Sequence, residues 1–246
     1  MKTFTIGKKK IVLKEEWMVG FITTWIVGLL AHAYRFFNFL PIWDSIYNFT
    51  GVGSTYTLGR WFLGYAGLIT SMFDLPWVNG AFSLFYISIV VILLTEMFEI
   101  KNKGMIVLCA AIFVSFPTVV SSFAYMYTAD AYLLAFLLAT LAVYLTWCVK
   151  KWGTIAGMVC LAFAMGIYQA YATVVIVLVL LYIIRQFVIE KLDFLEAVRK
   201  DLKYLGMLVG GAVLYAVILK ITLIRYNITL PGYQGIGALA VSYTHL

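Results

Sequence analysis

The sequence predicts an all-α, polytopic bundle of transmembrane helices. Of its 246 residues, 64% are hydrophobic and 12% are charged, whereas a soluble domain has about 45–50% apolar and about 25% charged residues. The apolar residues are gathered in runs long enough to cross a bilayer. The three cysteines (Cys109, Cys148, Cys160) fall inside these runs without metal or redox spacing, so we interpret them as packing residues.

The chain opens with a basic segment, residues 1–16, before its first apolar run at 17–34. A secretory signal peptide has the same order of charge and apolarity. The apolar run, however, exceeds the 7–15 residues of a signal core. We therefore expect a retained first span, because about 20 residues cross the hydrocarbon layer.

Six further apolar segments bring the expected total to about seven spans. The 34 apolar residues from 154 to 187 are too long for one crossing. They must turn at the polar interruption 166–171, where we expect a cavity open to the outer face. The alternating charges of 190–203 predict a surface helix. The six segments are 77–97, 105–121, 131–149, 154–168, 172–187 and 205–224.

The distribution of basic residues predicts the topology. Fourteen of the 18 lysines and arginines fall in the basic head and in alternate loops, and four fall on the other side. The positive-inside rule then places the N-terminus in the cytoplasm of a multi-pass cell-membrane protein. The basic residues behind the net charge of +7 therefore lie mainly in cytoplasmic segments. Because this topology explains the charge, we expect no nucleic-acid partner.

The first outer loop, residues 36–79, carries most of the polar residues that this topology places outside. A short helix is expected after Pro41, with Trp43 and Asp44 in its first turn. Apolar residues at three- and four-residue spacing from 58 to 73 predict an amphipathic helix in the membrane interface. A strip of small residues headed by Arg60 forms its other side.

Three acids face the outer side in this scheme, and such groups in a membrane protein are functional candidates. Asp44 can act as a general base toward a hydroxyl acceptor or cap a helix. The base is favoured, because a serine or asparagine cap would avoid an acid at the membrane surface. Asp74 is interpreted as a cap of the following span. For Asp130, at the expected start of a span, a cap and a functional acid remain alternatives.

Two other positions have paired interpretations. Arg60 can grip a phosphate through its guanidinium fork or extend to lipid headgroups. Gln169 and Tyr171, in the expected buried turn, can bind sugar hydroxyls or satisfy backbone groups at the break.

Several stretches together resemble the bacterial Gtr-type glucosyltransferases, the serotype-converting membrane enzymes, over about residues 17–224. The resemblance implies a GT-C-like fold that moves a hexose, glucose above all, from a polyprenyl-phosphate carrier to a cell-envelope glycan on the outer face. It further implies Asp44 as catalytic base and Arg60, Trp43, Trp61, Asp130, Gln169 and Tyr171 as substrate-binding residues. The stretches that carry it are Trp43-Asp44-Ser45, Gly59-Arg60-Trp61-Phe62, Phe73 to Gly80, Pro117 to Asp130 and Tyr168-Gln169-Ala170-Tyr171.

The implied chemistry needs no cofactor or metal, because polyprenyl phosphate is already a good leaving group. A membrane transporter or lipid-linked-sugar flippase is the alternative function, and a scaffold subunit a third. The absence of an inverted repeat argues against a transporter. We expect a transmembrane glycosyltransferase domain over residues 1–239, incomplete at its C-terminus. Residues 240–246 resemble a sequencing-adapter frame and are expected to be non-native.

Overall fold

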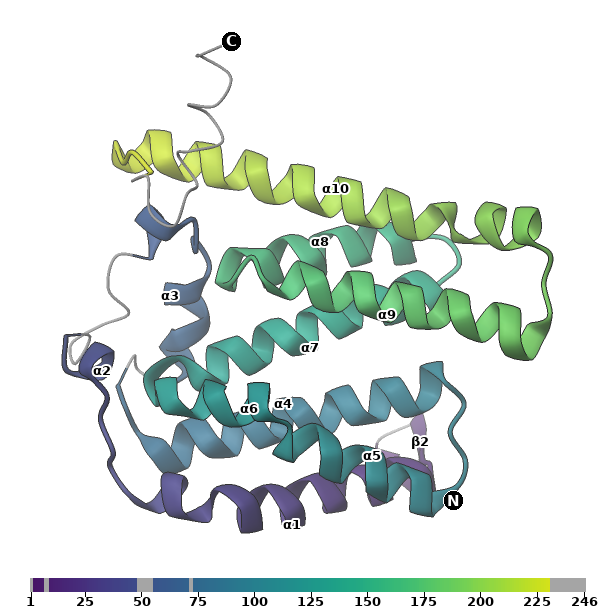
Figure 1. The fold of residues 1–246 in the computed structure, drawn as a ribbon, viewed down its shortest axis with the longest axis horizontal. Helices are drawn as coiled ribbons and strands as arrows, with labels where there is room; N and C mark the ends of the chain where they lie inside the picture. Colours follow the sequence, from purple (N-terminus) through teal and green to yellow (C-terminus); the bar gives the residue numbers. More distant parts are fainter. Residues whose placement is uncertain (1, 7–8, 48–54, 71–72, 231–246) are drawn as a thin grey trace.

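The structure, a computed structural model, describes residues 2–6, 9–47, 55–70 and 73–230. The expected adapter segment, 240–246, lies outside the described residues. The chain is an all-α bundle preceded by a short antiparallel hairpin of β1 (Lys2–Ile6) and β2 (Lys9–Leu13). The long helices run side by side across Figure 1.

Each of the seven predicted apolar segments coincides with helical chain. Pro117 starts a new helix after α5, because the residue before a proline is driven to an extended conformation, as at Phe116. The long elements are α1 (Glu15–Phe37), α4 (Pro76–Met97), α5 (Lys103–Ser115), α7 (Met126–Cys148), α8 (Gly153–Ile167), α9 (Tyr171–Arg185) and α10 (Phe194–Tyr226). The short ones are α2 (Trp43–Tyr47), η1 (Tyr56–Leu58), α3 (Leu63–Ala66), η2 (Gly67–Thr70), α6 (Pro117–Ser122), η3 (Phe123–Tyr125) and the π-helical η4 (Gln186–Glu190).

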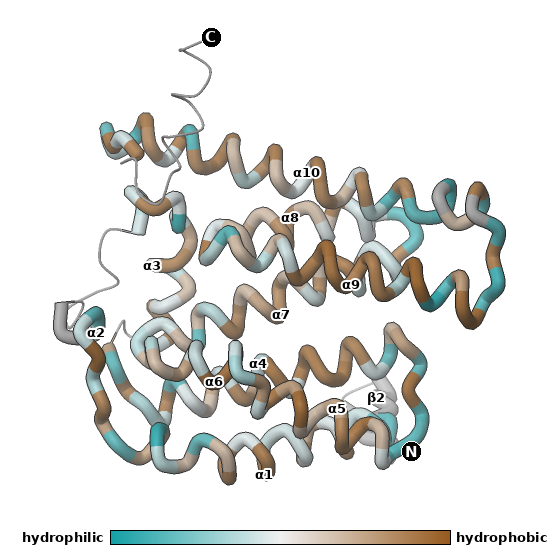
Figure 2. Tube along the Cα trace, viewed as in Figure 1, coloured by the Kyte–Doolittle hydropathy of each residue, from teal (hydrophilic) through white to brown (hydrophobic). Residues whose placement is uncertain are grey.

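A membrane bundle is supported by the lengths of these helices, but the count of seven spans is not confirmed. Five helical stretches of the described residues are long and apolar enough to cross a membrane. One of them joins α5, α6 and α7, and it reverses direction in Figure 1. The apolar α8 has only 15 residues. Figure 2 shows hydrophobic residues along the long helices and hydrophilic ones at their connections.

The centre of the bundle is α7, which packs against α4, α8 and α9. Residues of α7 take part in all three hydrophobic clusters of the structure. Many are alanines, which let neighbouring helices approach closely. At Gly157 of α8 a Cβ would lie only 2.8 Å from the Ala142 carbonyl oxygen of α7. This central helix also carries Tyr127, Asp130 and Tyr132.

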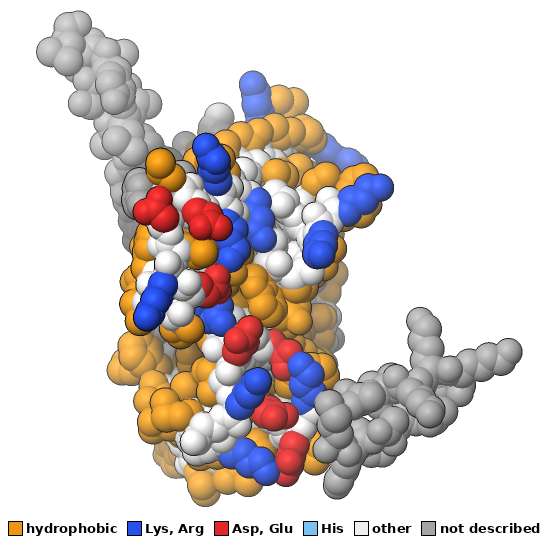
Figure 3. All heavy atoms as spheres, turned by 90° about the vertical axis from the view of Figure 1, so that its right-hand side faces the viewer, with side chains coloured by type: hydrophobic (Ala, Val, Ile, Leu, Met, Phe, Trp, Pro, Cys, Tyr) orange, Lys and Arg blue, Asp and Glu red, His pale blue; other side chains and the backbone are white. Residues whose placement is uncertain are grey.

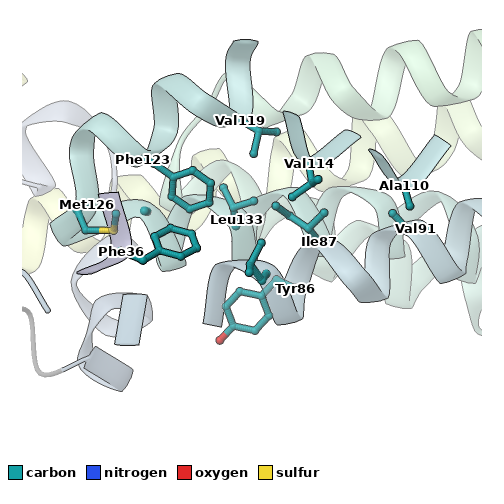
Figure 4. Packing of buried hydrophobic residues seen from close by; sticks show 12 residues of the cluster. Phe36, Tyr86, Ile87, Val91, Ala110, Val114, Val119, Phe123, Met126 and Leu133 are labelled. Atoms are coloured by element: carbon teal, nitrogen blue, oxygen red, sulfur yellow. The ribbon is translucent and has the colours of Figure 1, made fainter. Parts of the chain in front are cut away.

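The cluster in Figure 4 fixes the start of the first outer loop. The rings of Phe36, near the end of α1, and Phe123 meet edge to face at 5.0 Å. A Cβ at Gly80 of α4 would strike the Phe36 ring at 2.6 Å, so glycine allows this contact. His32 lies against Phe123 and hydrogen-bonds the Val114 carbonyl at 2.8 Å, as a packing residue does.

Charged side chains gather at the end of the bundle that the sequence places in the cytoplasm. Figure 3 shows lysine, arginine and acidic side chains together on this face. Every ion pair found among the described residues lies here, including Lys14–Glu96 at 2.6 Å and Arg185–Glu99 at 3.0 Å. The opposite end of Figure 1 holds α2 and α3.

Two predicted elements differ in the structure. The predicted surface helix 190–203 and the last span are one helix, because α10 runs without interruption for 33 residues. The predicted amphipathic helix 58–73 is broken into η1, α3 and η2. Gly59, with a φ of +73°, ends η1 in the left-handed conformation. In the broken segment, Trp61, Leu63 and Ala66 are buried. Tyr65 and Leu68 are exposed.

Candidate functional site

The Arg60 guanidinium is held by two aromatic residues. Its Nη1 donates to the Tyr132 hydroxyl at 3.2 Å, and its central carbon lies 4.5 Å from the centre of the Tyr168 ring. The two tyrosine rings are stacked at 5.5 Å. Its buried Nε has no hydrogen-bond partner among the described residues. This cation is positioned by aromatic stacking and keeps donors for an anion.

A hydrogen-bonded turn carries Arg60. The Arg60 amide donates to the Thr55 carbonyl at 2.9 Å, and the Gly59 amide donates to the Tyr56 carbonyl at 3.0 Å. Just after Arg60, the Phe62 amide donates at 2.8 Å to the Gly166 carbonyl at the end of α8. The turn is therefore closed on itself and attached to the bundle.

Trp61 supports this attachment. It is 7% exposed and meets the Phe163 ring of α8 edge to face at 5.2 Å. A Cβ at Gly166 would lie 2.7 Å from the indole ring, so Trp61 occupies the space that this glycine leaves. The structure thus places Trp61 in the packing beneath the Arg60 turn.

Gln169 lies in the break between α8 and α9, which the sequence predicted at 166–171 and the structure confirms. Its side-chain amide donates to the Leu58 carbonyl at 2.8 Å. Of the two interpretations from the sequence, the structure therefore supports the satisfaction of a backbone group, although the group belongs to the Arg60 turn instead of the break.

Asp130 is 1% exposed and forms a buried polar network with two neighbours. Its carboxylate accepts hydrogen bonds from the Asn79 amide at 3.0 Å and from the Thr70 hydroxyl at 3.1 Å. Because α7 begins at Met126, Asp130 lies in the second turn. The interpretation of Asp130 as a helix cap is therefore wrong, since the N-cap position of α7 is Tyr125.

Asp44 and Trp43 begin α2, as predicted. Both are exposed, Trp43 to 71%. Asp44 lies on α2, and Arg60 lies on the turn between η1 and α3.

Asp74 does not cap α4, contrary to the sequence-based interpretation. The N-cap position is Leu75, whose amide donates to the Asn79 side chain at 3.0 Å. Burial raises the pKa of the Asp74 carboxyl above its ordinary value, and the nearby Arg35 charge and Ser45 hydroxyl oppose this shift.

A cavity of about 440 Å³ lies between α4, α5, α6, α7 and α9, within the size range of small-molecule sites. Its wall is mainly apolar, and Tyr171 forms part of it. The Tyr171 ring also lies 6.3 Å from the Tyr168 ring. Tyr171 therefore borders both this cavity and the aromatic pair that holds Arg60.

Several residues of this region were not singled out from the sequence. Tyr132 and Tyr168 lie within or next to stretches that carried the resemblance, but only the fold brings their rings together over Arg60. Thr70 and Asn79 look like ordinary polar residues of a loop and a helix start. Within the part of the chain that the structure describes, no cluster of three or more histidine, cysteine or acidic side chains could hold a metal.

Comparison with protein families gives a match over most of the chain. Residues 33–244 match the family model described as Glucosyl transferase GtrII. This range includes the Arg60 turn, Asp44, Asp130 and the break at Gln169. No curated protein and no solved structure matches the chain at a significant level.

Proposed function

Because the chain belongs to the GtrII glucosyl transferase family, we propose that it moves glucose from a polyprenyl-phosphate carrier to a cell-envelope glycan. The proposed reaction takes place on the outer face of the cell membrane, with the N-terminus in the cytoplasm. The charged end of the bundle supports this orientation, since basic residues favour the cytoplasmic side.

The observation that carries the proposal is the fixed Arg60 guanidinium. An arginine fork suits the geometry of a phosphate group, and Tyr132 and Tyr168 orient this fork before any substrate binds. A preorganised cation stabilises the negative charge that grows on the leaving phosphate without further reorganisation. Arg60 is therefore the proposed contact to the phosphate of the carrier.

Asp44 is the proposed catalytic base. The oxygen of an acceptor hydroxyl attacks the anomeric carbon of glucose while the bond from that carbon to the phosphate oxygen breaks. The hydroxyl proton passes to the Asp44 carboxylate, and polyprenyl phosphate leaves with the electron pair. The reaction as proposed uses no cofactor and no metal.

The remaining proposed site residues fall into two groups. Trp43, exposed next to Asp44, and Tyr171, which lines the apolar cavity, are proposed to contact the sugar and the isoprenoid chain. Asp130, Trp61 and Gln169 are proposed to serve substrate binding by holding the outer loop in place.

Mass spectrometry of cell-envelope glycans tests this function. Cells that carry the full-length gene should contain a glycan with one added hexose, which should be absent after deletion and restored by the wild-type gene. Arg60→Ala should not restore it. Accumulation of the lipid-linked sugar on the cytoplasmic side after deletion would favour the flippase alternative, whereas loss of a transferase should leave it on the outer side.

A further inference from the structure

A side chain from the last helix reaches the turn that carries Arg60. The Tyr215 hydroxyl of α10 donates to the Gly59 carbonyl oxygen at 3.0 Å, across 156 residues of sequence. The same hydroxyl accepts a hydrogen bond of 2.9 Å from the Gln169 side-chain amide, which also donates to the Leu58 carbonyl. Two consecutive carbonyl groups of the turn are thus held by side chains from outside it.

Glycine at position 59 makes this contact possible. A Cβ there would lie 2.6 Å from the Gln169 amide nitrogen and 2.8 Å from the Tyr215 hydroxyl oxygen. The φ of +73° also disfavours any other residue. Gly59 therefore serves both the left-handed turn and the close approach of Gln169 and Tyr215.

Arg60 lies between two anchored positions. On one side Tyr215 and Gln169 hold the carbonyls of Leu58 and Gly59, and on the other the Phe62 amide bonds to α8. An arginine side chain has many rotamers, and the position of its guanidinium depends on where its backbone is held. Its direct hydrogen bond, 3.2 Å to Tyr132, is long. The backbone anchors therefore add to the order that Tyr132 and Tyr168 give the guanidinium.

We propose that Tyr215 is a positioning residue for Arg60. Its hydroxyl, together with the Gln169 amide, clamps the Leu58 and Gly59 carbonyls and so keeps the guanidinium against Tyr168. Tyr215 acts on the substrate through Arg60, and this role rests on the proposed function, in which Arg60 binds the phosphate. The last helix of the described chain is thereby coupled to the first outer loop.

The first arm of the test needs no activity. The full-length protein in native membranes is treated with phenylglyoxal, and modification of Arg60 is followed by peptide mass spectrometry. Loss of a hydrogen bond in Tyr215→Phe should speed modification roughly 2- to 10-fold. The matched control, Tyr204→Phe, removes a hydroxyl from the other end of the same helix and should leave the rate unchanged. An unchanged rate in Tyr215→Phe would overturn the proposal.

The second arm measures coupling through a double-mutant cycle. In transfer assays with polyprenyl-phosphate glucose, Tyr215→Phe should lower kcat/KM roughly 3- to 10-fold. In an Arg60→Ala background the same change should lower kcat/KM less than about twofold, because the guanidinium that Tyr215 positions is absent. An equal loss in both backgrounds would overturn the proposal, since a general structural defect adds to the loss of Arg60.

A failure of the variant to accumulate and a failure of the proposed function have different consequences. If Tyr215→Phe does not accumulate in membranes, Gln169→Met removes the clamp from the other side and goes through both arms under the same criteria. If the wild-type protein transfers no glucose, the proposed function fails, and the phenylglyoxal arm alone decides on the clamp.

Discussion

Asn79 and Asp130 join the start of α4 to the second turn of α7 through a buried hydrogen bond of 3.0 Å. Thr70, at the end of the outer loop, donates to the other oxygen of the same carboxylate. Each of these side chains is a hydrogen-bond partner of another one inside the bundle. Without the Asp130 carboxylate, the Asn79 amide keeps its 3.3 Å bond to the Thr70 hydroxyl, and that hydroxyl keeps its 3.2 Å bond to the Gly67 carbonyl. Each buried donor nevertheless loses an acceptor that water cannot replace.

Asp130→Ala should lower the free energy of unfolding by about 1–3 kcal/mol, because the buried Asn79 amide and Thr70 hydroxyl each lose one of their acceptors. Asn79→Ala should cost a similar amount, and the double variant should cost less than the sum. Denaturation of the detergent-solubilised protein measures all three, with Lys150→Ala, at an exposed position outside the helices, as a control that stays within about 0.5 kcal/mol. Strict additivity would contradict the network.

Variants of Arg60 test the proposed phosphate contact. Arg60→Ala should lower kcat/KM for the polyprenyl-phosphate donor by roughly 10²- to 10³-fold, the range seen when a group that stabilises developing charge is removed. Arg60→Lys keeps the charge and loses the planar fork, so its loss should be smaller. Steady-state kinetics on equal amounts of membrane-inserted protein compare the two. Equal losses would mean that the charge without the planar fork does not support the contact, and full activity of Arg60→Ala would contradict the contact itself.

Asp74 predicts a pH dependence of stability. Burial raises its native pKa above the ordinary value of 3.8. Between these two values the native state binds more protons than the unfolded state, so stability falls as pH rises and the loss is complete above the native pKa. Asp74→Asn should therefore be more stable than wild type at neutral pH, with the difference vanishing near pH 3.8 and below. Thermal unfolding at a series of pH values measures this, and a wild type that gains on the variant with rising pH would contradict it.

The proposed orientation can be tested by thiol labelling. The three native cysteines must first be replaced, because Cys148 is exposed close to one of the test positions. Single cysteines are then placed at Lys150, at the charged end, and at Asp44. An impermeant reagent applied to intact cells should label position 44 and leave 150 unlabelled until the cells are opened. The reverse pattern would invert the topology.

The helices were predictable because their signal is local. Apolar runs of sufficient length predicted all seven segments, and Gly166 to Tyr171 predicted the break between α8 and α9. The helix over 58–73 was predicted wrongly because periodicity alone cannot register the left-handed conformation of Gly59. At Gly59 the chain turns, and the Phe62 amide that follows bonds to the Gly166 carbonyl of α8.

The candidate site was predictable only in part. Asp44 and Arg60 stood out because charged groups are rare in such a chain. Their surroundings did not, because Tyr132, Tyr168 and Tyr215 come from α7, from the break between α8 and α9, and from α10, and they are three among 17 tyrosines. Contacts over such separations depend on the packing of α7, α8 and α10, and a single sequence carries no local signal for them.

The most direct test of the account is the transfer activity of Asp44→Asn in the full-length protein. Asparagine keeps the size of the side chain and caps a helix as well as aspartate does, so the variant should insert and accumulate normally. It cannot accept the acceptor proton, and glucose transfer from polyprenyl phosphate should fall by roughly 10²- to 10⁴-fold. Asp74→Asn, at another acid of the same loop, should retain its activity. Full transfer by Asp44→Asn would contradict the assignment of Asp44 as the base.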